Sequence, residues 1–312
     1  MTVHTGNVLC LNCLSWGSSP SKTREEEHTA IVEAFKASAA QGAQPGAIVL
    51  QDYAWASDSG LDVLVKLMDE ATNSLNWKAV RQWGDEQDPS AESLRDAVIL
   101  YDRSVYIGTG IEKPEVGAFR DNDDLLAGMQ ADIKAQLAGF IGRWAGIELE
   151  VLGPDGKAGD LMFLLVSYHG RKMMRANNDI LPVQTAVKAS MAKDFISQVA
   201  DLGAKESAPA LIAGCWNIDS MPLTAHGGHR SCELSKAEWT CTVHHSDTVE
   251  KDSVGQPMNK VDYGVAIHPA AGANTTTDLK VLDVVTLEHP KAIASHFQHK
   301  PLLLKIQVAP KA

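Results

Sequence analysis

The feature that most constrains the fold of this chain is a series of short apolar segments, each bordered by polar or titratable residues. In the clearest case, the segment 210–213 runs into Gly214 and then into Cys215, Trp216 and Asn217. A rigid strand that stops at glycine and then presents a thiol and an amide is a common way to build a site, because glycine lets another group approach closely. Taken alone, the pattern also fits an ordinary strand end with a buried cysteine.

Four further predicted strands have polar residues at one end. Asn12, Asp52 and His169 follow the apolar runs of three of them, and His299 precedes the last. These strands are predicted at 7–12, 47–50, 161–168 and 302–308. Polar side chains at successive strand ends indicate a site assembled on a sheet-based scaffold.

Helices separate several of these strands. Thr23 and Glu26 have capping-box spacing and predict a helix through about residue 40, and helical periodicity predicts others at 59–73, 124–144 and 185–202. More strands are predicted at 77–83, 96–101, 105–108, 239–243, 261–267 and 281–287, with a turn over 151–160. Because strands and helices alternate while some strands follow one another directly, we expect an α/β (α+β) fold. We expect two packed mixed β-sheets flanked by helices, in one domain covering residues 1–312.

Composition narrows the function classes. The 312 residues carry a formal net charge of −11, which disfavours loose binding to nucleic acid, because that binding needs a basic surface. No apolar run approaches the ~20 residues that span a bilayer, and no secretory signal opens the chain. We therefore expect a cytoplasmic protein with no membrane span. Five cysteines, an odd number at low density, argue against a disulfide framework.

Two groups of cysteine and histidine residues have metal-site spacing. Cys10 and Cys13 form a C-x-x-C pair, but strand alternation places them on opposite faces, which disfavours a redox or zinc role. The segment 226–245 combines H-x-x-H with C-x-x-H, near zinc-finger spacing. The favoured alternative for this segment is a hairpin, because residues 239–243 have the pattern of a strand. Spacing without geometry does not make a site.

Taken in order, the strand ends resemble the motifs of the endonuclease/exonuclease/phosphatase superfamily, which includes deoxyribonuclease I. The family motifs are a first-strand asparagine, Leu-Gln-Glu, Thr-His, Gly-Asp-Phe-Asn, Arg-Ile-Asp-Tyr and Ser-Asp-His-x-Pro-Leu. The similar segments here are Leu9-Cys-Leu-Asn12, Ile48-Val-Leu-Gln-Asp52, Val166-Ser-Tyr-His169, Ile212-Ala-Gly-Cys-Trp-Asn217, Lys260-Val-Asp-Tyr263 and Phe297-Gln-His-Lys-Pro-Leu302. The resemblance covers nearly the whole chain and implies a four-layer α/β sandwich with the site at one end of two packed sheets.

The resemblance also implies roles for individual residues. The implied catalytic residues are His169, Asn217, His299 and Cys215. Asp52 and Asn12 are the implied ligands of Mg²⁺ or another divalent cation, with zinc less favoured. The residues expected to bind substrate are Arg171, Lys172, Gln298 and Asp262.

Three departures from the family pattern bear on the chemistry. Asp52 is one methylene shorter than the family's glutamate, although its carboxylate remains a ligand type that Mg²⁺ takes. Cys215 stands where the family has an aspartate that acts on the attacking water, and a thiol is a base only when ionised. Gln298 replaces the aspartate before the histidine, and a glutamine cannot stabilise an imidazolium at His299 as a carboxylate would.

Three hypotheses follow. The first is a divergent phosphoesterase that hydrolyses a phosphate-bearing small molecule or nucleic acid with the help of a divalent cation. The second is a catalytically disabled member that serves as a binding or scaffold protein with a protein partner. The third is different chemistry, in which Cys215 is a nucleophile, or binds zinc together with His169 and His299.

Overall fold

The computed structural model describes residues 3–13, 23–81, 96–111, 142–170, 181–216, 239–246, 262–269, 275–288, 297 and 299–311. The helices of these regions are α1 (Arg24–Ala40), α2 (Asp58–Thr72) and α5 (Leu181–Glu206). The strands are β1 (His4–Asn12), β2 (Ala47–Tyr53), β3 (Trp77–Arg81), β4 (Asp96–Asp102), β5 (Tyr106–Thr109), β6 (Gly142–Leu152), β7 (Ala158–Gly170), β8 (Ala210–Cys215), β9 (Trp239–His244), β10 (Asp262–Pro269), β11 (Thr277–Thr286) and β12 (Leu302–Pro310). None of the helices in these regions is long and apolar enough to cross a membrane.

The strands form two six-stranded sheets of similar design. The first has the order β11-β12-β1-β2-β4-β3 and the second β5-β6-β7-β8-β10-β9. Each sheet has one parallel pair at its centre, β1 with β2 and β7 with β8, and antiparallel neighbours elsewhere. The two parallel pairs are formed by strands that the sequence predicts to end in polar residues.

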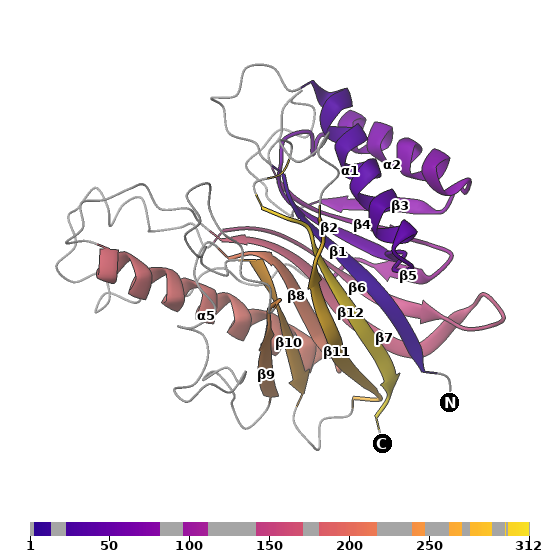
Figure 1. Cartoon of the computed structure of the whole chain (residues 1–312). Helices are drawn as coiled ribbons and strands as arrows, with labels where there is room; N and C mark the ends of the chain where they lie inside the picture. The colour runs from indigo at the N-terminus through magenta and orange to yellow at the C-terminus, as the bar shows by residue number, and fades with distance from the viewer. Residues whose placement is uncertain are drawn as a thin grey trace.

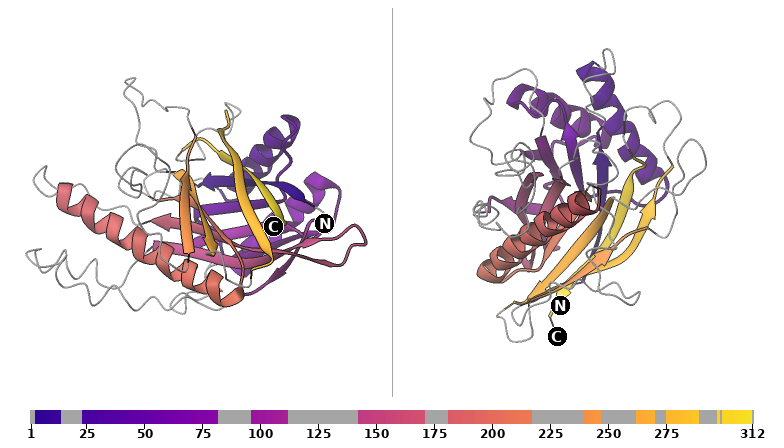
Figure 2. Two further views of the ribbon diagram at one scale, coloured as in Figure 1. Left: turned by 90° about the horizontal axis from the view of Figure 1, so that it is seen from below. Right: turned by 90° about the vertical axis from the view of Figure 1, so that its left-hand side faces the viewer.

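Three apolar clusters between the layers show that the molecule is a four-layer sandwich, as expected. One cluster joins α1 and α2 to the first sheet, a second lies between the two sheets, and a third joins α5 to the second sheet. Figures 1 and 2 show α1 and α2 on one side of the sheets and α5 on the opposite side. Cys10 belongs to the cluster between the sheets and Cys13 to the cluster under α1, so the predicted separation of these two thiols is confirmed.

The helices begin where the sequence places capping residues. The side chain of Thr23 accepts a hydrogen bond from the backbone of Glu26, and the side chain of Glu26 accepts one from the backbone of Thr23, so the predicted capping box is confirmed. At α2 the side chain of Ser57 accepts a hydrogen bond from the backbone of Gly60, and Asn73 ends that helix in the left-handed conformation. These caps fix the helices that cover the first sheet.

One predicted helix is wrong at its carboxyl end, over residues 142–144. The predicted helix 124–144 overlaps β6, which begins at Gly142, while residues 124–141 lie outside the described regions. In β6, Ala145, Ile147 and Leu149 face the core between the sheets, whereas Trp144 packs in the cluster with α5. This alternation has the period of a strand, and pairing with β7 over ten registered positions outweighs the local helical pattern.

The directions of the strands explain where polar side chains collect. The carboxyl ends of β1 and β2 lie together, as do those of β7 and β8. Strand β10 is antiparallel to β8, and β12 is antiparallel to β1, so their amino ends lie at the same edges. Six strand ends can therefore contribute to one site, as the sequence predicts.

Candidate functional site

Three candidate residues lie side by side across the second sheet. His169 of β7 is in register with Cys215 of β8, and Cys215 is in register with Asp262 of β10. Residues in register on neighbouring strands project from the same face. Leu211 and Ala213 have the same parity as Cys215 and belong to the cluster between the sheets. The three side chains therefore share the face of the second sheet that looks toward the first.

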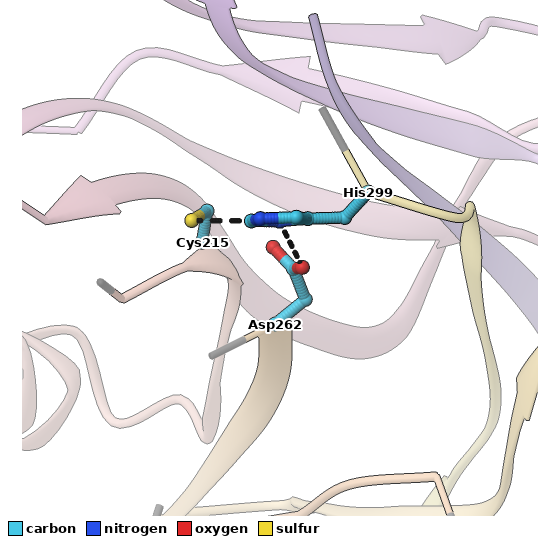
Figure 3. Close-up of side chains that lie close together, drawn as sticks. All are labelled: Cys215, Asp262 and His299. Atoms are coloured by element: carbon cyan, nitrogen blue, oxygen red, sulfur yellow. Dashed lines mark hydrogen bonds and ion pairs between the residues drawn. The ribbon is translucent and has the colours of Figure 1, made fainter. Parts of the chain in front are cut away.

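His299 connects this row to the first sheet. Its Nδ1 atom lies 2.5 Å from Oδ2 of Asp262, 3.9 Å from Sγ of Cys215 and 3.4 Å from Nδ2 of Asn12. Figure 3 shows Cys215 and Asp262 converging on the ring of His299. An isolated antiparallel β-bridge between the backbones of Cys13 and Phe297 holds the segment that carries His299 against the end of β1. Asn12, Cys215, Asp262 and His299 thus come from both sheets and form one cluster.

The short contact to Asp262 fixes the proton on Nδ1 of His299. A lone pair on Nδ1 would repel a carboxylate oxygen at 2.5 Å, so this nitrogen donates a hydrogen bond to Asp262. Nε2 is then the basic nitrogen of the neutral ring. Nδ2 of Asn12 is also a donor, so its 3.4 Å approach to Nδ1 is a contact between two donors.

A carboxylate lies against His299 although Gln298 replaces the aspartate of the family motif. The partner is Asp262, at the amino end of β10, and Gln298 lies outside the described residues. The two positions are more than thirty residues apart in sequence, so no local pattern shows their contact. Asp262 is predicted as a substrate-binding residue, and the structure places its carboxylate against the imidazole.

The cluster is largely buried. The side chains of His299 and Asp262 are 9% and 15% exposed, and Cys215 and Asn12 are buried. Oδ1 of Asn12 and Oδ1 of Asp262 have no hydrogen-bond partner among the described residues. A buried oxygen without a donor costs free energy, so these two atoms favour a cation or a donor ligand.

Cys215 does not form a nucleophile triad with His299 and Asp262. In such a triad the carboxylate binds one ring nitrogen and the nucleophile binds the other. Here the thiol and the carboxylate face the same atom, Nδ1. The proton that Asp262 holds on Nδ1 prevents that nitrogen from accepting the thiol proton. The geometry therefore argues against the hypothesis that His299 activates Cys215 as a nucleophile.

Asp52 lies at the carboxyl end of β2 with a second carboxylate nearby. Its backbone is in the left-handed region, with φ of 51°, and its side chain is largely buried. Burial, then Glu27 and then Asp52 raise the pKa of the Cys13 thiol, which indicates that both carboxylates lie near that thiol. Glu27 is buried and accepts a hydrogen bond from Nε1 of Trp55 at 3.0 Å.

Sequence reasoning missed Glu27 as a candidate residue. A signal was present, because Glu27 precedes Ala30 and Ile31 by three and four residues and so lies on the buried face of α1. A carboxylate on an apolar helix face is unusual unless it has a partner.

A hydrogen-bonded network joins the two sheets directly beneath the site. Nε2 of Gln51 donates to Oγ of Ser167 at 3.1 Å, and this hydroxyl donates to the backbone oxygen of Leu50 at 2.9 Å. The thiol of Cys10 donates to Oε1 of Gln51 at 3.3 Å. Gln51 precedes Asp52, and Ser167 lies two residues before His169. The network therefore holds the ends of β2 and β7 in place relative to each other.

Gly214 allows β8 to approach β7 at the site. A Cβ atom at this position would overlap the backbone carbonyl of Tyr168. The predicted role of this glycine, close approach of another group, is confirmed, and the group is the neighbouring strand. Tyr168 is fully buried there, and burial followed by the charge of Cys215 raises the pKa of its hydroxyl.

Several predicted residues lie outside the described regions. They are Asn217, Arg171, Lys172 and Gln298. Most of the segment 226–245 lies outside them as well, but its last part forms β9 as predicted. Cys241 of β9 is buried in the cluster with α5, which supports the strand interpretation of these residues.

Comparisons with known proteins identify the fold. The chain is similar to an endonuclease/exonuclease/phosphatase family protein from Bacteroides thetaiotaomicron, with 14% identity, a TM-score of 0.51 and coverage of 98% of both chains. It is also similar to D. rerio TDP2 in complex with a single-strand DNA product, with 9% identity, a TM-score of 0.51, and coverage of 97% of this chain and 98% of that chain. No family model and no curated protein matches the sequence. The chain therefore has the endonuclease/exonuclease/phosphatase fold.

Proposed function

We propose that the protein hydrolyses a phosphoester with His299 and Asp262 as its central catalytic pair. The observation that carries this proposal is the 2.5 Å contact between Nδ1 of His299 and Oδ2 of Asp262, at the edge where both sheets present polar residues. A carboxylate on Nδ1 orients the ring and stabilises its protonated form. The pair therefore supplies a base or an acid even though Cys215 replaces a carboxylate.

In the proposed reaction, Nε2 of His299 accepts the proton of the attacking water. The oxygen of the water forms a bond to phosphorus, and the bond from phosphorus to the leaving alcohol oxygen breaks. Asp262 stabilises the imidazolium through its hydrogen bond to Nδ1. The leaving oxygen lies opposite the attacking water and takes a proton from solvent, to which the imidazolium then loses its own. His169, on the same face of the second sheet, binds a phosphate oxygen.

Mg²⁺ is the cofactor that the resemblance implies, and the chemistry of Asn12 and Asp52 fits it. Oδ1 of Asn12 is a hard oxygen ligand that has no hydrogen-bond partner among the described residues. Asp52 adds one carboxylate, and Mg²⁺ commonly uses one or two carboxylates while it keeps several waters. When bound, Mg²⁺ would offset the negative charge of the phosphoryl group.

The proposed substrate is a phosphate-bearing small molecule or a short single-stranded nucleic acid. The net charge of −11 disfavours a non-specific nuclease. The complex of D. rerio TDP2 with a single-strand DNA product motivates the inclusion of single-stranded DNA among the substrates tested. Arg171 and Lys172 follow β7 in sequence and are proposed to attract the substrate phosphate.

A second candidate function is a binding or scaffold role on a disabled site. Cys215 favours this candidate, because a neutral thiol is a poor substitute for a carboxylate as a base or as a ligand of Mg²⁺. In that case the polar residues at these strand ends bind a ligand or protein without turning it over.

Activity assays separate the two candidates. Purified protein is incubated with Mg²⁺ and a nitrophenyl phosphate monoester, a bis-nitrophenyl phosphate diester or a single-stranded oligonucleotide. If the protein is a hydrolase, at least one substrate releases nitrophenol, phosphate or nucleotides. The variant His299→Ala is then expected to lower kcat by about 100-fold or more. His268→Ala is the matched control, because His268 also faces a carboxylate, Asp278, at the far end of β10.

The variant Cys215→Asp tests the second candidate. A disabled site predicts no turnover in the original protein and a gain of turnover in this variant. No turnover in either protein with any substrate would contradict the proposed hydrolysis.

A further inference from the structure

The geometry points to a second metal site, for a thiophilic divalent cation such as Zn²⁺, formed by Cys215, Asp262 and His299. One ligand atom from each residue lies within 4.8 Å of those of the other two. Thiolate, imidazole and carboxylate are the three ligand types that zinc uses in proteins. This donor set differs from the hard oxygen atoms of Asn12 and Asp52, so it selects a different metal.

The distances require only a small adjustment for zinc. Tetrahedral coordination, with bonds of about 2.3 Å to sulfur and about 2.0–2.2 Å to nitrogen and oxygen, separates neighbouring ligand atoms by about 3.4–3.6 Å. The present distances are 3.9 Å from the thiol of Cys215 to Nδ1 of His299 and 2.5 Å from that nitrogen to Asp262. The thiol therefore moves inward slightly, and the Asp262 oxygen moves away from His299 by about 1 Å.

Asn12 supplies an independent observation. It is 3% exposed, its amide points at Nδ1 of His299, and its Oδ1 has no hydrogen-bond partner among the described residues. Oδ1 of Asp262 also lacks a partner among those residues, so the carboxylate can present either oxygen.

Zinc bound at this site is incompatible with the hydrogen bond between His299 and Asp262. Nδ1 of His299 carries a proton and donates a hydrogen bond to Asp262. It must lose that proton before it can coordinate a metal. The site consequently inhibits hydrolysis when zinc is bound. This consequence rests on the proposed function, whereas binding of the metal does not.

A titration with Co²⁺, a spectroscopic substitute for Zn²⁺, tests the binding without any enzyme assay. We expect one equivalent of Co²⁺ to give a thiolate charge-transfer band in the near ultraviolet, and Zn²⁺ to remove it by displacement. Cys215→Ser abolishes the band. Cys241→Ser, in the core under α5, leaves the band unchanged. The double variant His226→Ala/His229→Ala also retains it, which separates this site from the zinc-finger-like spacing of 226–245.

A second variant keeps the test decisive if Cys215→Ser does not fold. His299→Ala removes another ligand and weakens Zn²⁺ binding by roughly 100-fold or more in calorimetry. No thiolate band in the original protein, a band that survives Cys215→Ser, or unchanged zinc affinity in His299→Ala would overturn the site. If the site binds zinc and no substrate is hydrolysed, the proposed function fails while this inference stands.

Discussion

Nδ1 of His299 has two neighbouring side chains, a carboxylate and a thiol. Asp262 accepts a hydrogen bond from it, while Cys215 lies on the same side of the ring at a longer distance. Gln298 cannot stabilise the imidazolium of His299, but Asp262 on another strand supplies a carboxylate for that purpose. A histidine–carboxylate pair brought together by strand pairing leaves no local sequence pattern. Sequence order therefore named both residues as site candidates but did not show their contact.

His28 is a buried residue whose ionisation affects stability. Nε2 of His28 and the hydroxyl of Tyr53 are hydrogen-bonded at 2.5 Å. Burial, with a smaller contribution from Arg24, lowers the pKa of His28 from 6.5 to about 4. The folded pKa is lower than the unfolded pKa, so the unfolded chain binds more protons between pH 4 and 6.5. The free energy of unfolding therefore falls as the pH falls through this range.

We predict that this group accounts for about 2 kcal/mol of lost stability between pH 7.5 and pH 5. Urea unfolding at the two pH values measures the loss in the original protein and in His28→Gln. The variant is expected to lose about 2 kcal/mol less than the original protein. Equal losses would mean that His28 is not held neutral in the folded state.

Gly214 is predicted to tolerate no side chain. Gly214→Ala places a Cβ atom against the carbonyl of Tyr168, and we expect a loss of about 3 kcal/mol or more in the free energy of unfolding. Gly42→Ala is the control, because Gly42 has φ of 78° but nothing within 4 Å of an added Cβ. Its cost is about 1–2 kcal/mol, from the left-handed conformation alone. Similar losses in the two variants would refute the close approach of β7 and β8.

At the scale of elements, the sequence predicts the helices and strands that have both a clear hydrophobic pattern and recognisable residues at their ends. The capping box of Thr23 and Glu26 and the apolar run of β8 both have local causes, and both are confirmed. Strand β6 was mistaken in part for a helix, because its identity depends on β7 and on the core between the sheets rather than on local propensity. Pairing of distant segments is the information that local patterns do not contain.

The network at Ser167 provides a test at this scale. Ser167→Ala removes the acceptor of Gln51 and the donor to Leu50. The side-chain amide of Gln51 and the backbone carbonyl of Leu50 each lose one buried hydrogen bond. We expect the free energy of unfolding to fall by about 1–3 kcal/mol. Thermal unfolding measures this change. Ser59→Ala is the control, since Ser59 is exposed in the first turn of α2, and an equal effect there would argue against the network.

At the scale of the whole molecule, topology explains why one edge carries the chemistry. Each sheet centres on a parallel pair, and the carboxyl ends of both pairs face the amino ends of β10 and β12. The order of polar strand ends predicted this convergence, and the family resemblance implied the four-layer arrangement. It could not give the contacts of single atoms, because a shift of one residue in register moves a side chain to the other face.

The central claim, that His299 and Asp262 act as one catalytic unit, is tested most directly by a double-mutant cycle on kcat. His299→Ala, Asp262→Asn and the double variant are compared on the best substrate of the panel, with His268→Ala as the control. Groups that act as a unit are strongly non-additive. We predict that each single change lowers kcat by about 100-fold or more, that the double variant is no slower than the slower single variant, and that the control is unaffected. Additive losses, or full activity in Asp262→Asn, would contradict the account.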